Sequence, residues 1–309
     1  MKNSESAFRV LALDGGGSKG FYTLGVLHEL EAMLGCRLSD RFDLIYGTST
    51  GSIIGTLLAL GYSVDQVHKL YVEHVPAIMS ESDGKDKSVA LAKLANEVFG
   101  QHKFEDMKTR VGIVATRWMT ELPMIFKSDV SQAFGRKATF RPGFGVPLSE
   151  AIQASCSAYP FFNRIKVKTD QDEEVELFDG GFCANNPTLY AIADAVKAMG
   201  SDHSRVRVLN VGVGEFPAKA PTFMMSLKKR TVLTIELCQK ILEINTKSMD
   251  QLRSLLFDDV QTVRVSDIFD VPELATDFLE HDLKKLDAIR QRGRESFAPR
   301  ERLLAEMFN

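Results

Sequence analysis

The chain has 309 residues, of which 44% are apolar, so it is long enough to bury a large core. Its formal net charge of −3 gives no global attraction to nucleic acid, and we expect no nucleic acid polymer as a partner. The four cysteines form no CxxC pair, which favours free thiols over a metal site or a disulfide framework. Neither a signal peptide nor a membrane-spanning apolar run is evident, so we expect a cytoplasmic protein.

The first sixty residues alternate between strand-like and helix-like segments. Phe8–Leu13 and Phe42–Tyr46 are short apolar runs typical of buried strands. Apolar residues recur at helical spacing in Lys19–Leu34, and Thr50–Leu60 is an apolar helix closed by a glycine. The order strand, helix, strand, helix predicts a parallel sheet covered by helices.

The rest of the chain continues this pattern and then becomes mainly helical. The fold class that we predict is a three-layer α/β/α arrangement with a mainly parallel central sheet and a helical C-terminal portion. We expect a catalytic core over residues 1–215 and a mainly helical part, residues 216–309, packed on the same domain. The sequence predicts helices at Ser63–Glu73, Val89–Phe99 and Thr188–Met199, strands at Val111–Thr116, Pro123–Phe126, Val175–Phe178, Arg205–Val213 and Val260–Val265, and a loop at Ser80–Lys87.

A glycine-rich loop, DGGGSKG, occupies Asp14–Gly20 between the first strand and the first helix. N–H groups at the start of a helix lack intrahelical acceptors, so such a loop can hold negative charge. Gly15, Gly17 and Gly20 match the GxGxxG pattern of dinucleotide-binding proteins, but the same groups could stabilise the oxyanion of ester hydrolysis. The aspartate before three consecutive glycines favours the oxyanion, because a dinucleotide fingerprint prefers an apolar residue there. A turn needed only for tight packing is the third interpretation.

The segment GTSTG, Gly47–Gly51, matches the GxSxG pattern of a nucleophile elbow. It lies between a predicted strand and a predicted helix, which is the context that this motif requires. Gly47 and Gly51 avoid side-chain collisions across the tight bend, and the following helix favours negative charge near Ser49. The alternative is an ordinary serine at a helix N-cap. The flanking strand and helix favour a nucleophile.

A serine hydroxyl needs a base to become a good nucleophile. Most of the six histidines fall in helical or charged stretches, and His203 is the best candidate for a triad. The alternative base is Asp179, which ends a predicted strand and precedes Gly180 and Gly181, a pair suited to unusual backbone dihedrals. A carboxylate can act as base where desolvation raises its pKa. Asp-Gly-Gly is also a common turn sequence.

Together, these three motifs resemble those of the patatin-like phospholipases, which share a DGGG-x-[KR]-G loop, a GxSxG elbow and a D-G-[AG] motif. The similarity extends to ASCSAYPFF, Ala154–Phe162, and to Asn185-Asn186-Pro187, which follows the Asp-Gly-Gly motif. The resemblance implies that Ser49 is the nucleophile, that Asp179 is its base, and that the N–H groups of Gly16 and Gly17 hold the oxyanion. It also implies hydrolysis of glycerophospholipid acyl esters without metal or organic cofactor.

Compact patatins of this length are also similar to the effectors of cyclic-oligonucleotide antiphage systems (CBASS). This narrower resemblance implies a cyclic dinucleotide activator, a role in antiviral defence, action at the inner face of the cell membrane, and self-association on activation. Within Pro221–Arg230, apolar side chains lie beside three cations, as at a lipid surface, although an ordinary helix start is the simpler interpretation. Two other hypotheses are a dinucleotide-binding Rossmann-like protein and a catalytically silent protein that keeps the fold.

Overall fold

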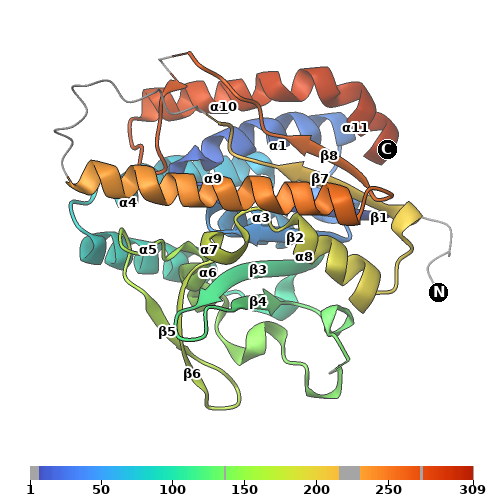
Figure 1. The fold of residues 1–309 in the computed structure, drawn as a ribbon, viewed down its shortest axis with the longest axis horizontal. Helices are drawn as coiled ribbons and strands as arrows, with labels where there is room; N and C mark the ends of the chain where they lie inside the picture. The colour runs from blue at the N-terminus through green and yellow to red at the C-terminus, as the bar shows by residue number, and fades with distance from the viewer. Residues whose placement is uncertain (1–6, 136, 216–229, 272–273, 309) are drawn as a thin grey trace.

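The computed structural model describes residues 7–135, 137–215, 230–271 and 274–308, with the side chains of 230–233 excepted. The membrane-binding segment considered above therefore lies almost entirely outside the described residues. The described chain is an α/β protein with one central sheet (Figure 1). Its strands are β1 (Phe8–Leu13), β2 (Leu44–Thr48), β3 (Arg110–Arg117), β4 (Pro123–Lys127), β5 (Ile165–Lys168), β6 (Glu174–Asp179), β7 (Val206–Val211) and β8 (Gln261–Val265).

The helices cover both faces of this sheet. Alternate residues of the strands point to opposite sides, so that Leu11 and Leu13 join one hydrophobic core while Val10 joins the other. The larger core lies under helices α1, α3, α4, α5, α6, α10 and α11, and the smaller one lies under α7 and α8. The helices are α1 (Gly20–Leu34), α2 (Leu38–Arg41), α3 (Thr50–Ala59), α4 (Val64–Ser80), α5 (Gly84–Phe99), α6 (Leu148–Cys156), α7 (Gly181–Ala184), α8 (Thr188–Ala193), α9 (Arg230–Leu256), α10 (Leu283–Phe297) and α11 (Glu301–Phe308).

The sheet is mixed, with the order β5-β6-β3-β2-β1-β7-β8 and with β4 paired to β3 off this path. Strands β3, β2, β1, β7 and β8 are parallel, whereas β4 and β6 run antiparallel to β3. The predicted fold class is confirmed: helices cover a sheet that is parallel through its centre. The antiparallel strands all lie at the β3 end.

Two strands meet end to end along one edge of β3. Strand β2 ends at Thr48, which pairs with Val114, and β6 ends at Asp179, which pairs with Ala115. Ala115 also pairs with β4, and a strand has only two edges, so β6 must lie on the edge that β2 occupies. Since β2 and β6 run in opposite directions, their carboxyl ends converge. The residue after β2 is Ser49.

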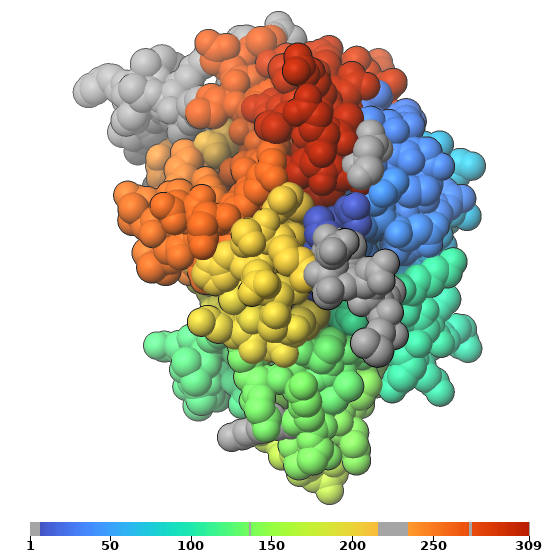
Figure 2. Space-filling view, turned by 90° about the vertical axis from the view of Figure 1, so that its right-hand side faces the viewer, coloured from blue at the N-terminus to red at the C-terminus, as the bar shows by residue number. Residues whose placement is uncertain are grey.

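The C-terminal part of the chain contributes to the same sheet and core. Strand β8 pairs with β7, and α10 packs closely along α1. Glycines allow this close approach: a Cβ atom at Gly25 would lie 2.0 Å from the Arg290 carbonyl oxygen, and one at Gly293 would lie 2.1 Å from that of Tyr22. Figure 2 shows the resulting contact between the red C-terminal residues and the blue N-terminal residues. The domain boundary at residue 215 stays a prediction.

Two segment predictions differ from the structure. The helix expected to end at Glu73 continues to Ser80, and the loop expected over Ser80–Lys87 is interrupted by the start of α5 at Gly84. The Asp83 carboxylate accepts hydrogen bonds from the N–H groups of Lys85 and Asp86 at 2.8 Å, so it caps this helix. A capping residue therefore lies within the polar stretch that was expected to be a loop.

Candidate active site

The elbow at Ser49 has a backbone conformation that is uncommon for a residue with a side chain. Ser49 has φ 52° and ψ −124°, and α3 begins at the next residue. A Cβ atom at Gly47 would lie 2.2 Å from the Gly51 carbonyl oxygen, and one at Gly51 would lie 2.3 Å from that of Leu13. Both positions therefore require glycine. The backbone conformation of Ser49 costs about 1–3 kcal/mol, and strain of this kind is found at functional sites.

Ser155, in helix α6, holds the elbow through its side chain. Its hydroxyl accepts a hydrogen bond from the Ser49 N–H at 2.9 Å and donates one to the Val114 carbonyl oxygen at 2.6 Å. The C-terminal end of α6 also contacts the segment that carries Asp179. The Asp179 N–H donates a hydrogen bond to the carbonyl oxygen of Ser157, and the Gly180 N–H donates one to that of Ser155. Helix α6 thus fixes both catalytic candidates.

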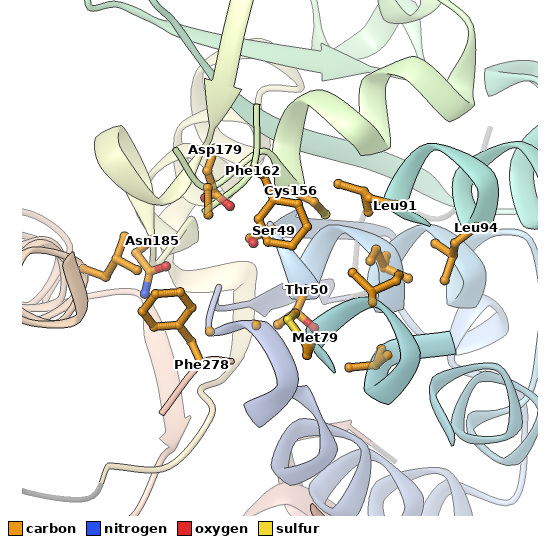
Figure 3. Close-up of a pocket in the computed structure, with 17 residues that line it drawn as sticks. Ser49, Thr50, Met79, Leu91, Leu94, Cys156, Phe162, Asp179, Asn185 and Phe278 are labelled. Atoms are coloured by element: carbon orange, nitrogen blue, oxygen red, sulfur yellow. The ribbon is translucent and has the colours of Figure 1, made fainter. Parts of the chain in front are cut away.

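Asp179 lies at the end of β6, with 3% of its surface exposed. Its Oδ1 atom accepts a hydrogen bond from the Gly181 N–H at 2.6 Å. Figure 3 shows the carboxylate and the Ser49 side chain facing each other. Burial raises the pKa of Asp179 to about 6, although the Gly181 N–H and the Ser49 hydroxyl act in the opposite direction. A carboxylate with this pKa is ionised near neutral pH and still has appreciable proton affinity.

This pKa predicts the pH dependence of the reaction. A base must be ionised to accept the proton of Ser49, so with Asp179 in this role we expect kcat/KM to be constant at higher pH and to fall tenfold per pH unit below about 6. The measurement is the pH profile of kcat/KM on a soluble short-chain ester, which avoids titration of lipid headgroups. A profile that is flat from about pH 5 to about pH 8 would contradict this role for Asp179.

The glycine loop forms another wall of the site. Gly16 and Gly17 line the pocket that also contains Ser49 and Asp179. Within the described part of the chain, the N–H groups of Gly16 and Gly17 donate to no protein acceptor, so they are free to stabilise an oxyanion. Gly17 has φ +59°, and a Cβ atom there would lie 2.2 Å from the Phe278 carbonyl oxygen. Helix α1 begins directly after this loop, at Gly20.

Asp14 anchors the loop and does not line the catalytic pocket. Its carboxylate is buried and accepts hydrogen bonds from Asn210 at 2.7 Å and from the Arg264 guanidinium at 2.8 Å. Its N–H donates to the Val211 carbonyl oxygen. Arg264 belongs to β8, so the C-terminal part of the chain helps to position the loop.

The catalytic pocket is mostly apolar. It contains about 660 Å³ of free space, part of it open to solvent, and Ser49 and Asp179 lie between Asn185 and Phe278 on one side and Leu91 and Leu94 on the other (Figure 3). Helices α4 and α5 supply most of the wall facing the serine. Apolar side chains that line the pocket are Ile53, Val75, Ile78, Met79, Leu91, Leu94, Ala158, Phe162, Leu242 and Phe278. An apolar lining of this kind suits the acyl chain of a lipid.

The structure argues against the alternative base and corrects one expectation about Gly180. His203 is half-buried, pairs with Asp259 at 2.9 Å and does not line the pocket, so it is not the base of Ser49. Gly180 has ordinary helical dihedrals, φ −66° and ψ −19°, instead of unusual ones. Glycine is needed there because a Cβ atom would lie 2.2 Å from the Val114 carbonyl oxygen.

Some residues that shape the site are not evident from the sequence alone. Leu242 of α9 lines the pocket, and Asn245 and Thr246 of the same helix bind Asn185, close to the base. Phe278 lines the pocket and its carbonyl oxygen accepts the Ser18 N–H at 3.1 Å. These residues are far from the motifs in the chain, and no local pattern marks them.

A family model described as "Patatin-like phospholipase" matches residues 11–192, a range that contains the loop, the elbow and Asp179. The chain therefore belongs to the patatin-like phospholipase family, and this membership favours a hydrolase over a dinucleotide-binding protein. It is 60% identical over 303 residues to an Escherichia coli protein named "cUMP-AMP-activated phospholipase", covering 98% of this chain and 94% of that one.

Further comparisons give a more distant relative in sequence and a solved structure of similar fold. A "cGAMP-activated phospholipase" of Escherichia coli (strain TW11681) is 28% identical over 246 residues, covering 72% of this chain and 66% of that one. Among solved structures, VipD from Legionella pneumophila is similar in fold, with a TM-score of 0.50 and 11% identity, over 98% of this chain and 67% of that one. In the described part of the chain, no helix is long and apolar enough to cross a membrane.

Proposed function

We propose that this chain is a phospholipase that hydrolyses acyl esters of membrane glycerophospholipids and is activated by a cyclic dinucleotide. The observation that carries the catalytic part is the convergence of β2 and β6, which brings Ser49 and Asp179 together in the wall of an apolar pocket. The free N–H groups of Gly16 and Gly17 border the same pocket. A nucleophile, a base and an oxyanion site are the minimum for acyl transfer.

The reaction proceeds in two steps. Asp179 removes the proton of Ser49 as its Oγ attacks the ester carbonyl carbon, and the N–H groups of Gly16 and Gly17 stabilise the oxyanion. Collapse of the tetrahedral intermediate breaks the ester bond, and protonated Asp179 gives its proton to the departing lysophospholipid oxygen. Water then attacks the acyl-serine with Asp179 again acting as base, which releases the fatty acid and restores the enzyme.

Support for the activator comes from the relatives. The 60% identical protein is named for activation by cUMP-AMP, and two more distant relatives are named for activation by cGAMP. The similarity to the first relative spans nearly the whole of both chains, so it is not limited to the catalytic motifs. Action at the inner face of the cell membrane, as an antiphage effector, follows as part of this proposal.

The test is fatty-acid release from phospholipid vesicles, measured without nucleotide and with cUMP-AMP, cGAMP or a linear dinucleotide. We expect release that depends on cUMP-AMP and that is absent in Ser49→Ala. Equal release with and without every nucleotide would overturn the activation and leave the hydrolase in place. Hydrolysis of a soluble ester without any release from vesicles would overturn the lipid substrate.

A further inference from the structure

Asn185 connects the oxyanion loop to the turn that carries the base. Gly15 N–H donates to the Asn185 carbonyl oxygen at 2.9 Å, and Asn185 Nδ2 donates back to the Gly15 carbonyl oxygen at 3.3 Å. On its other side, Asn185 directly follows the short helix α7, which starts two residues after Asp179. Asn185 therefore links the loop that carries the oxyanion donors to the turn that follows the base.

Side chains of helix α9 bind both the main chain and the side chain of Asn185. Asn245 Oδ1 accepts the Asn185 N–H at 2.8 Å, and Asn245 Nδ2 donates to the Cys183 carbonyl oxygen at 3.1 Å. The neighbouring residue, Thr246, accepts a hydrogen bond from Asn185 Nδ2 at 2.7 Å through its hydroxyl. Thr246 is 7% exposed, so water cannot readily replace it as the acceptor.

The packing around the Asn185 side chain leaves little room for movement. A Cβ atom at Gly15 would lie 2.4 Å from Asn185 Oδ1, and one at Gly181 would lie 2.9 Å from the same oxygen. Oδ1 is buried and accepts no hydrogen bond in the described structure, while both acceptors of Nδ2 are oxygens. If the amide turned over, Oδ1 would face the Gly15 carbonyl oxygen, which cannot donate, so the observed orientation is favoured. In this orientation the Thr246 hydroxyl is the acceptor that α9 provides for Nδ2.

We infer that Asn245 and Thr246 are positioning residues of the hydrolase: acting through Asn185, they hold the oxyanion loop in register with Asp179. This inference rests on the proposed function. It also identifies α9 as the helix whose displacement would disturb the catalytic geometry. The outer side of α9 exposes apolar side chains, with Leu237, Ile244 and Leu255 each more than half exposed, so the inward bonds of Asn245 and Thr246 are important for holding this helix in place.

The test compares Thr246→Val, which keeps the shape but removes the hydroxyl, with Thr246→Ser, which keeps the hydroxyl. Ser248→Ala, which removes an exposed hydroxyl from the same helix, is the matched control. With a soluble ester and saturating cUMP-AMP, we expect Thr246→Val to lower kcat about tenfold with KM within about twofold, because a small misplacement of catalytic groups acts on the transition state. Thr246→Ser and Ser248→Ala should retain kcat within about twofold.

A second measurement separates positioning from a folding defect. The rate at which a fluorophosphonate labels Ser49 depends on the same oxyanion donors and base, and it is measured beside the circular dichroism of each variant. A folded Thr246→Val that is labelled and turns over like wild type overturns the inference, as does a Thr246→Ser that fails to restore kcat. If Thr246→Val does not fold, Asn245→Asp, which keeps the acceptor for Asn185 N–H, should lower kcat in its place. Wild type that neither hydrolyses esters nor is labelled would instead overturn the proposed function.

Discussion

Replacing Ser49 by alanine is expected to abolish lipid hydrolysis, with kcat lowered by at least about 10³-fold. In the proposed mechanism the Oγ atom of Ser49 forms the covalent intermediate, and neither of the two neighbouring side chains that carry a hydroxyl or thiol is suited to replace it. Thr50 is engaged with Tyr71, at 2.7 Å. Cys156 lies nearby, but burial raises the pKa of its thiol well above the usual range, which keeps it protonated. The loss should therefore be nearly complete.

The measurement is fatty-acid release from vesicles together with fluorophosphonate labelling, which reports on the serine without any lipid. Ser39→Ala is the control, because it removes a buried hydroxyl from α2, outside the pocket, and should leave both readouts unchanged. Ser49→Ala that still released fatty acid at more than about one tenth of the wild-type rate would assign the nucleophile elsewhere.

The motifs predicted much of this site because its backbone requirements are local. Gly47 must avoid the carbonyl oxygen of Gly51, four residues on, and Gly51 must avoid that of Leu13 at the end of the neighbouring strand β1, so the tight turn leaves a recognisable glycine pattern. The strand and helix around Ser49 were likewise expected at nearly the positions found, since both are short and strongly apolar. The preference for Asp179 over His203 agrees with their places in the structure: the first lines the pocket and the second does not.

What the sequence did not indicate depends on pairing between distant segments. The opposed directions of β2 and β6 follow from the antiparallel pairing of β6 with β3, which no local pattern specifies. The contacts of Asn245 and Thr246 with Asn185 span about sixty residues of chain and use side chains that are ordinary in a helix. The reason for glycine at position 180 was not predictable either, because a Cβ atom there would collide with the carbonyl oxygen of Val114, which belongs to the distant strand β3.

Replacing Asp179 by asparagine is expected to lower kcat by about 10³-fold and, at neutral pH, to stabilise the fold. The amide keeps the shape and can still accept the Gly181 N–H, but it cannot take a proton from Ser49. The stabilisation arises because burial raises the pKa of Asp179 from 3.8 to about 6, so the ionised carboxylate is less favourable in the folded protein than in the unfolded chain.

The sign of the pH dependence follows from proton binding. Between 3.8 and about 6 the folded protein holds a proton on Asp179 that the unfolded chain has lost, so the stability of wild type falls as pH rises through this window. The loss reaches about 3 kcal/mol above it, since one pKa unit corresponds to about 1.4 kcal/mol. The asparagine variant, which carries no charge, avoids this loss.

Denaturant unfolding at two pH values measures the effect. At about pH 7.5 the free energy of unfolding of Asp179→Asn should exceed that of wild type by up to about 3 kcal/mol, and at about pH 4 the difference should vanish, because the wild-type carboxyl is then neutral in the folded state. Asp129→Asn is a control with the opposite expected sign. Burial raises the pKa of Asp129, but Ser131 and Arg110 outweigh it and lower the pKa, so the ionised carboxylate stabilises the fold and its loss should destabilise it at high pH. A variant at Asp179 that is inactive and no more stable at high pH would show that the carboxylate is not held at an energetic cost. Inactivity combined with greater stability would instead mark Asp179 as a group whose burial destabilises the fold and, by raising its proton affinity, makes it an effective base for Ser49.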